Sequence, residues 1–485
     1  MYKRQLRGEG IEFRLYESAL GRSSLLARLR GSGEGRPLIL LNHIDVVPAN
    51  PENWQIHPFS GEIADGFIWG RGALDMKGMG VMELMAFIAA AREGLELGRD
   101  VVFLAVADEE AGGYSGARML LEKHPEELEA DLVINEGGYA TMDLVPGKPF
   151  FMIANAEKYG YWLRLRRRGI GGHGSMPTGQ GALDHMVPAL ARLLASKRPM
   201  SINPTMQAFF ARLAEHWEIL FPYRDDGSLE TLERLVEENN LAALPALSAV
   251  VRDTVSLNML NAGVKINVIP DEAEAFLDCR LLPETEGDDF LAYIREALGD
   301  PDMEVDVFMD MERAPASPLE GLFIAAIERA VRANYPDAVS SPFMLSGLSD
   351  SRFFRARGIP CYGIIPARLG LADLTRIHGV DERIAVQDVK DGVKFLYDLI
   401  VAVSYTHLRA HETVLDLVCR LLLEKKKKFI THYPLTTHPL LQTYHCSSTG
   451  LHTSINTHPS THLSPIHHTK PYNPPTHHTS ARILT

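Results

Sequence analysis

Short apolar runs that end on histidine or acidic side chains constrain the fold of this chain more than any other feature. The run at residues 38–42 ends at His43, and the run at 101–107 ends at the triple acid of residues 108–110, with a helical pattern at 78–93 between them. Alternation of strands and helices favours a mostly parallel sheet with helices on both faces. Ligands of such sheets gather beyond the carboxyl ends of the strands, so we expect an α/β fold with a polar site at that edge.

The strand and helix pattern divides the chain into three parts. Residues 6–159 and 310–402 show the α/β pattern and are expected to form one catalytic domain. Residues 160–309 follow the order β-α-β-β-α-β, with strands at 159–168, 254–260, 273–282 and 303–308 and helices at 182–195 and 288–298. That order is typical of a ferredoxin-like α+β domain, which we expect here as an insertion. A further helical stretch at about 205–250 has no readable role.

The composition indicates an ordinary globular protein. Its 46% hydrophobic and 23% charged residues are typical of soluble chains, and its 485 residues allow about two to three domains. A net charge of −13 disfavours nucleic acid or an anionic membrane as a partner. No apolar run approaches the roughly 18 residues of a membrane-spanning helix. Four cysteines form no disulfide framework, which fits a reducing, cytoplasmic location.

The composition changes abruptly near residue 403. Twelve of the nineteen histidines follow it, and residues 431–485 are rich in Thr, His, Pro and Ser without apolar periodicity, which predicts disorder. One interpretation is a histidine-rich metal-binding tail. We favour another, in which residues 403–485 are a translated sequencing adapter and residues 1–5 a translated transposon end. On that interpretation the natural N-terminus is missing, and no helix is expected before Ile11.

Five positions in the predicted catalytic domain carry side chains that bind metals. They are His43, Asp75, Glu110, Glu136 and His378. Taken singly, an acidic loop is more often solvated, and a histidine after a strand is more often structural. However, three adjacent carboxylates at a strand end repel each other unless cations lie nearby, and five such positions in one domain argue against coincidence. Imidazole and carboxylate groups together suit a hydrolytic zinc site.

Seven motifs, in this order and spacing, carry a resemblance to one enzyme family. They are HIDVVP at residues 43–48, GRGALDMKG at 70–78, DEEAGG at 108–113, NEG at 135–137, GHGSMP at 172–177, NVIP at 267–270 and HGVDER at 378–383. Over nearly all of residues 11–402 the chain resembles the di-zinc aminoacylase and carboxypeptidase family of metallopeptidases, in particular its carboxypeptidase S branch. The resemblance implies a zinc exopeptidase-like catalytic domain with an inserted lid and dimerisation domain.

The resemblance also implies a role for each matching residue of the metal centre. Asp75 would bridge two Zn²⁺ ions, although Co²⁺ or Mn²⁺ also suit such ligands. His43 and Glu136 would complete one site, and Glu110 and His378 the other. The general base that activates water would be Glu109. Asp45 would hydrogen-bond the outer nitrogen of the imidazole of His43, with a strand-end cap as its alternative role.

Other matching residues would contact the substrate. The family uses His173 to stabilise the tetrahedral oxyanion, often from a neighbouring subunit, so a homodimer through the inserted domain is expected. The alternative for His173 is an exposed histidine in a glycine-rich turn. Asn267 and Arg280 would lie on the substrate side, and Arg280 would bind a carboxylate through two parallel hydrogen bonds, unless it forms only a salt bridge on its strand. Gly347 and Asp350 belong to a stretch, GLSDSR at 347–352, that resembles the family's substrate loop.

The expected function is metal-dependent hydrolysis of an amide bond next to a free carboxylate, in short peptides or N-acyl amino acids. A dedicated biosynthetic deacylase, such as a desuccinylase, is one alternative. A non-catalytic binding protein that keeps the fold is another, and it predicts the loss of a ligand or of the base, whereas all six positions are filled. A metal store built on the histidine-rich tail is the third.

Overall fold

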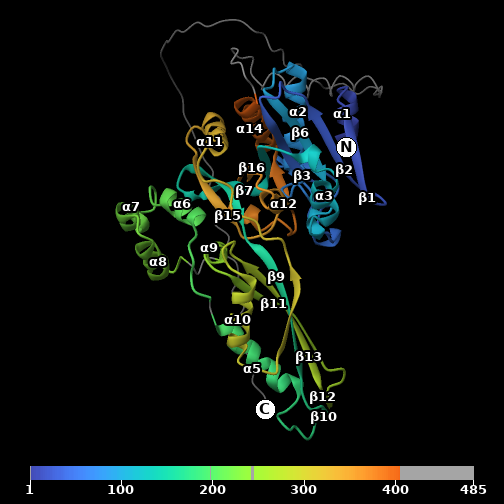
Figure 1. Cartoon of the computed structure of the whole chain (residues 1–485), viewed down its shortest axis with the longest axis vertical. Coiled ribbons are helices and arrows are strands. Elements are labelled where there is room, and N and C mark those ends of the chain that lie inside the picture. Colours follow the sequence, from blue (N-terminus) through green and yellow to red (C-terminus); the bar gives the residue numbers. More distant parts are fainter. Residues whose placement is uncertain (1, 197, 242–244, 405–485) are drawn as a thin grey trace, which may run out of the picture. The chain divides into compact units, whose positions relative to one another are not determined.

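The computed structural model describes residues 2–196, 198–241 and 245–404 (Figure 1). The tail predicted to be disordered and adapter-derived lies outside the described residues, apart from its first two positions. A helix, α1 (Tyr2–Gly8), precedes Ile11, and the expectation that none would do so is wrong. It forms because Tyr2 and Leu6 bury their side chains in the core, where the Tyr2 ring packs edge-on against Phe103 at 5.3 Å.

A large sheet of eight strands is the centre of the α/β part. Its order is β1-β2-β6-β3-β7-β16-β8-β15. Strands β6, β3, β7 and β16 at its centre are parallel, and β1, β2 and β8 add antiparallel pairings. The mostly parallel sheet predicted from the sequence is confirmed. The bounds are β1 (Phe13–Ala19), β2 (Arg22–Leu29), β3 (Gly35–His43), β6 (Arg99–Val106), β7 (Leu132–Val145), β8 (Lys148–Glu157), β15 (Val339–Leu345) and β16 (Cys361–Leu369).

Helices cover both faces of this sheet, as the apolar strand runs predict. In β3, Leu38 and Leu40 face one core and Ile39 and Leu41 face another, because successive side chains point to opposite faces. The first core is closed by α2 (Lys77–Glu93), α11 (Leu322–Asn334) and α14 (Val386–Ser404). The second is closed by α3 (Met119–Lys123), α4 (Pro125–Leu128) and α12 (Ser351–Arg355). Among the described residues, no helix is both long and apolar enough to cross a bilayer.

The inserted part, residues 160–309, has the element order expected from the sequence. Its strands are β9 (Tyr159–Arg168), β11 (Thr254–Ala262), β13 (Glu272–Leu281) and β14 (Glu304–Asp310), and its helices are α5 (Ala182–Ala195) and α10 (Gly287–Leu298). The four strands form an antiparallel sheet in the order β11-β13-β9-β14, which is the ferredoxin-like arrangement. Two short strands, β10 (Gly172–His173) and β12 (Val268–Ile269), pair with each other beyond it.

The helical stretch at 205–250 covers one end of the large sheet. Its helices are α6 (Pro204–Leu213), α7 (Phe221–Asp226), α8 (Leu229–Glu238) and α9 (Pro245–Val250). Phe209 and Phe210 of α6 pack with Phe150 of β8 and Phe343 of β15 in a third core. Because β15 is the last strand of the sheet, this stretch covers an otherwise exposed edge.

A small sheet lies next to the loop that carries Asp75. It consists of β4 (Ile63–Ala64), β5 (Phe67–Trp69) and β17 (Arg383–Ala385), and the short helix α13 (Leu371–Leu374) comes before β17 in the chain. The hairpin between β4 and β5 turns at Asp65 and Gly66, both at positive φ, as the Asp-Gly pair predicts. Pairing of β17 with β5 brings the loop of His378 towards that of Asp75.

Candidate metal centre

Parallel neighbours in the sheet bring the predicted ligands together. His43 is the last residue of β3, Glu110 follows the end of β6, and Glu136 lies in β7, on the other side of β3. The carboxyl ends of parallel strands meet at one edge, so these three residues converge there although the chain separates them widely. Asp75, just before α2, and His378, after α13, reach the same edge from loops.

The five side chains form two groups that share Asp75. His43 Nε2 lies 3.0 Å from Asp75 Oδ1 and 3.5 Å from Glu136 Oε1. His378 Nε2 lies 3.1 Å from Asp75 Oδ2 and 3.2 Å from Glu110 Oε2. In each group the ligand atoms lie within 4.8 Å of one another. This is the pairing that the sequence predicts, with one oxygen of Asp75 facing each group.

The electrostatics of the two groups match the requirements of cations. Hydrogen bonds to Asp75 and Glu110 raise the pKa of His378 to about 10. Burial, and then the charge of Asp75, raises the pKa of Glu136 to about 7. One oxygen of Glu110 is buried with no hydrogen-bond partner among the described residues. Imidazoles and carboxylates that crowd together in this way are a suitable donor set for two divalent cations.

The three acids after β6 separate into two roles. Asp108 is at positive φ, a conformation that aspartate tolerates better than most residues, and its carboxylate accepts hydrogen bonds from Arg22 and from the N–H of Ser115. Asp108 therefore shapes the turn, while Glu110 belongs to the second ligand group. Burial and the charges of Glu136 and Asp350 raise the pKa of Glu109.

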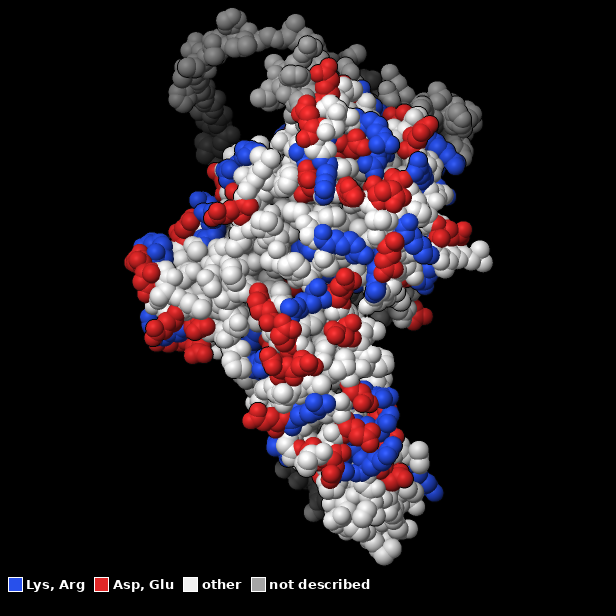
Figure 2. Space-filling view, in the orientation of Figure 1, with Lys and Arg blue, Asp and Glu red and all other residues white. Residues whose placement is uncertain are grey.

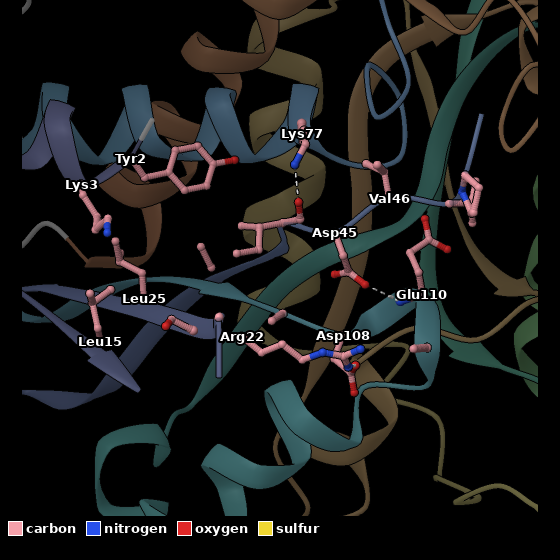
Figure 3. A pocket seen from close by; sticks show the side chains of 18 residues that line it. Tyr2, Lys3, Leu15, Arg22, Leu25, Asp45, Val46, Lys77, Asp108 and Glu110 are labelled. Carbon is pink, nitrogen blue, oxygen red and sulfur yellow. Dashed lines mark hydrogen bonds and ion pairs between the residues drawn. The ribbon is translucent and has the colours of Figure 1, made fainter. Parts of the chain in front are cut away.

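Asp45 holds the turn that carries the base. Its carboxylate accepts hydrogen bonds from the backbone N–H of Glu109 at 3.3 Å and of Glu110 at 3.1 Å. Figure 3 shows the bond to Glu110. The outer nitrogen of His43, Nδ1, is 3.1 Å from the backbone oxygen of Asp45 and 3.6 Å from its carboxylate. Asp45 therefore orients His43 mainly through its carbonyl, whereas the sequence suggests the carboxylate.

Two further residues support the centre and are not identified from the sequence. The carboxylate of Glu382 accepts backbone N–H groups from the loop that precedes α2, those of Gly72, Leu74 and Asp75. Arg71 pairs with Glu382 and also donates to the backbone oxygens of His378 and Gly379. Both residues belong to motifs named above, GRGALDMKG and HGVDER. The presence of a charged residue within each motif is the sequence feature that could have pointed to them.

A cavity of about 610 Å³ opens onto the centre. Glu109 lines it together with Asp75, Glu110, Glu136 and His378, so the predicted base and four of the five predicted ligands face one space. A larger hollow of about 940 Å³ touches Glu110 from another side (Figure 3). Glu109, Asp75 and both histidines do not line that hollow, so the reaction would take place in the smaller cavity.

The predicted substrate residues divide into two sets. Gly347 and Arg280 line the cavity. Arg280 also makes two hydrogen bonds to Asp278, of 2.7 and 3.1 Å, so the salt bridge on the strand, the alternative role for Arg280, is present. Asp350 differs from the prediction, since it is 1% exposed behind the turn of residues 108–113 and does not line the cavity. Its burial follows from the packing of α12, which the sequence does not reveal.

His173 and Asn267 lie together, away from the cavity. The backbone N–H of Gly174 donates to the oxygen of Asn267 at 2.9 Å where β10 and β12 pair, and His173 Nδ1 is 2.8 Å from Ser175 Oγ. Both are exposed, and neither lines the cavity. Within a single chain the structure therefore does not bring these two predicted residues to the metal centre.

Comparison with known proteins yields a family and several relatives. Residues 39–402 match the family described as Peptidase family M20/M25/M40. The N-fatty-acyl-amino acid synthase/hydrolase of Xenopus tropicalis is 30% identical, over 82% of this chain and 80% of that protein. Carboxypeptidase S of Saccharomyces cerevisiae is 26% identical, over 76% and 72%. The crystal structure of an M20 family metallo-carboxypeptidase from Sulfolobus solfataricus has a TM-score of 0.62 at 20% identity, over 82% and 92%.

Proposed function

This chain belongs to the Peptidase family M20/M25/M40, and we propose that it cleaves the amide bond next to a free carboxylate in short peptides or N-acyl amino acids. The family predicted from the seven motifs is confirmed, and with it an enzyme of the metallopeptidase and amidohydrolase class. The observation that carries the proposal is the position of Asp75, with one carboxylate oxygen 3.0 Å from His43 and the other 3.1 Å from His378.

We propose two divalent metal ions, and Zn²⁺ in the first place, as the cofactors. His43, Glu136 and Asp75 would hold one, and Asp75, Glu110 and His378 the other. Bound there, the ions would polarise the substrate carbonyl and lower the pKa of water. A relative of the same fold, from Bacillus subtilis, is described as a dinuclear metal-binding peptidase. Carboxylate-rich ligand sets also accept Co²⁺ or Mn²⁺.

Glu109 would move the proton. It lines the cavity beside the ligands, and Asp45 fixes its turn through two backbone hydrogen bonds. Glu109 would take a proton from the attacking water and deliver it to the nitrogen of the leaving amine, so that one carboxylate serves as base and then as acid. Burial raises its pKa, which favours a group able to hold that proton between the two steps.

Two of the residues that would recognise the substrate line the cavity. Arg280 has N–H groups beyond those given to Asp278 and would bind the free carboxylate, and the backbone at Gly347 would lie along the substrate. The names of two relatives, an N-fatty-acyl-amino acid synthase/hydrolase and carboxypeptidase S, both refer to compounds with such a carboxylate. A desuccinylase remains the alternative within this chemistry.

A homodimer would supply His173. This residue is exposed on β10, and the surface around it carries large exposed apolar side chains, with Met176 69%, Val264 95% and Ile266 103% exposed. Figure 2 shows this end of the inserted part as a surface with few charges. Exposed apolar patches mark interaction sites, so this end is suited to contact a second copy and to carry His173 towards the partner's cavity.

A panel of substrates tests the proposed function. Purified protein, treated with chelator and reloaded with Zn²⁺, Co²⁺ or Mn²⁺, is offered dipeptides, N-acetyl amino acids, longer N-acyl amino acids and N-succinyl-diaminopimelate. We expect metal-dependent release of the amino acid from dipeptides or N-acyl amino acids. Activity confined to the succinylated substrate would favour the biosynthetic deacylase, and binding without turnover of any substrate would favour a non-catalytic protein.

A further inference from the structure

The exposed face of the inserted sheet changes character where it meets the cavity. Farther along that face, charged side chains pair across the strands, as Arg164 does with Asp306 and Arg166 with Glu274. At the cavity the same face carries Trp162 of β9. A sheet face that is simply exposed to solvent would carry charged side chains along its whole length. The apolar side chain at the cavity therefore indicates a different role for this part of the face.

Trp162 and a methionine form one continuous apolar surface. Met309 of β14 is the direct cross-strand partner of Trp162, and both line the cavity. Met311, two residues further, adds its side chain to the same wall and packs against Gly160, where any larger residue would collide with its sulfur. Directly opposed side chains on a sheet lie close enough to act as a unit.

Asp278 fixes the orientation of this surface. Its carboxylate accepts the indole N–H of Trp162 at 3.0 Å and also holds Arg280. The indole N–H is therefore hydrogen-bonded within the protein, and the apolar ring of Trp162 lines the cavity. The same anchor places a cationic group for a carboxylate next to an apolar platform, which is the arrangement an amphiphilic ligand requires.

We propose that Trp162, Met309 and Met311 bind an extended apolar acyl chain and set the preference of the enzyme for N-acyl amino acids over dipeptides. This inference rests on the proposed hydrolase function and specifies its substrate. The cavity has further apolar lining from Tyr139, Leu345 and Ile365 of the large sheet. Methionine side chains are flexible and polarizable, so the wall accepts chains of differing length rather than one fixed shape.

The proposal predicts a dependence on chain length. Each buried methylene contributes enough to change binding about fourfold, until the chain outgrows the wall. N-acetyl-, N-octanoyl- and N-lauroyl-phenylalanine are compared, both as substrates of the metal-loaded enzyme and as ligands of the chelator-treated protein, with binding followed by titration calorimetry. We expect kcat/KM and affinity to rise from acetyl to octanoyl, and both octanoyl and lauroyl compounds to bind the metal-free protein.

A polar replacement isolates the wall. Met309→Gln keeps the length of the side chain and should lower the octanoyl-to-acetyl ratio of kcat/KM by about tenfold. Trp162→Phe, which keeps an apolar ring, should retain most of the ratio. Met259→Gln is the matched control, since Met259 is exposed on β11 and does not line the cavity.

The outcomes separate this inference from the proposed function. Two results would refute the acyl-chain site without affecting the proposed hydrolase function. One is hydrolysis of N-acetyl amino acids with no gain from a longer chain, and the other is an unchanged octanoyl-to-acetyl ratio of kcat/KM in Met309→Gln. If the metal-free protein binds longer chains more tightly but no amide is hydrolysed, the acyl-chain site is supported and the proposed hydrolase function is rejected. If Met259→Gln changes the ratio as strongly as Met309→Gln, the effect does not arise at this wall and the inference fails.

Discussion

Arg71 and Glu382 form a buried ion pair, with Arg71 Nη1 2.7 Å from Glu382 Oε2. Glu382 accepts the backbone N–H of Asp75, and Arg71 donates to the backbone oxygen of His378. The pair thus joins the two loops that carry Asp75 and His378, two of the three members of the second group of candidate ligands. Neither loop belongs to the sheet. The ion pair therefore holds Asp75 and His378 in position, as the pairing of parallel strands holds His43 and Glu136.

Substitution of Glu382 by Gln should therefore weaken both folding and metal binding. It leaves the buried Arg71 without a counter-charge, and breaking a buried pair in this way costs about 3–5 kcal/mol. We expect a lower free energy of unfolding for the metal-free protein in urea, and weaker metal affinity of the folded fraction by calorimetry. Glu126→Gln, at an exposed position, is the control. Equal stability of the two variants would show that the pair is dispensable.

The sequence predicts the centre of this molecule better than its edges. The runs ending at His43 and before Asp108 are apolar on both faces, so strand, burial and site location follow from one pattern. Strand β1 at the edge is mostly exposed, has no apolar alternation and was not predicted. Asp350 and Glu382 show the other limit. Both residues contact backbone and side chains from distant segments of the chain. The sequence near each residue therefore does not predict these contacts.

Loss of Asp75 should remove both metals. Its two oxygens face different histidines, so Asp75→Ala takes a ligand from each group, whereas Glu136→Ala takes one from the first group only. We expect the metal content of the purified protein, measured by inductively coupled plasma mass spectrometry, to fall to near zero in Asp75→Ala and to about half in Glu136→Ala. Two metals retained by Asp75→Ala would refute the shared-ligand assignment.

Replacing Glu109 by Gln should separate metal binding from turnover. Glu109 is not in either ligand group, and glutamine keeps its shape while it loses the ability to take a proton. We expect unchanged metal content and a fall in kcat of roughly 10²–10⁴, the usual contribution of a general base. A variant that keeps near-normal kcat would remove Glu109 from this role, and one that loses metal would place it among the ligands.

Metal binding should depend on pH through His378. In the metal-free protein, hydrogen bonds to Asp75 and Glu110 raise the pKa of His378 to about 10, so at about pH 7 its imidazole carries a proton. A metal can bind only after that proton leaves, and affinity therefore rises as the pH is raised towards the raised pKa, by about tenfold per pH unit for each proton displaced. Calorimetry in buffers of different ionisation enthalpy should detect proton release, which His378→Ala should reduce. Proton release of the same size in that variant would contradict the assignment.

His173 offers a test of whether one active site needs two chains. It is exposed and does not line the cavity of its own chain, so a catalytic role requires delivery by a partner. His173→Ala should keep its metals and lose roughly 10²–10³ in kcat, the usual loss for an oxyanion donor. If His173 acts in trans, a mixture of His173→Ala and Glu109→Gln should recover activity that neither has alone, because a mixed dimer holds one site with an intact base and an intact histidine. His185→Ala, on α5 of the same inserted part, should change neither kcat nor the outcome of mixing. A His173→Ala protein with reduced kcat that no mixing restores would place His173 in its own chain's site, after a movement of the inserted part.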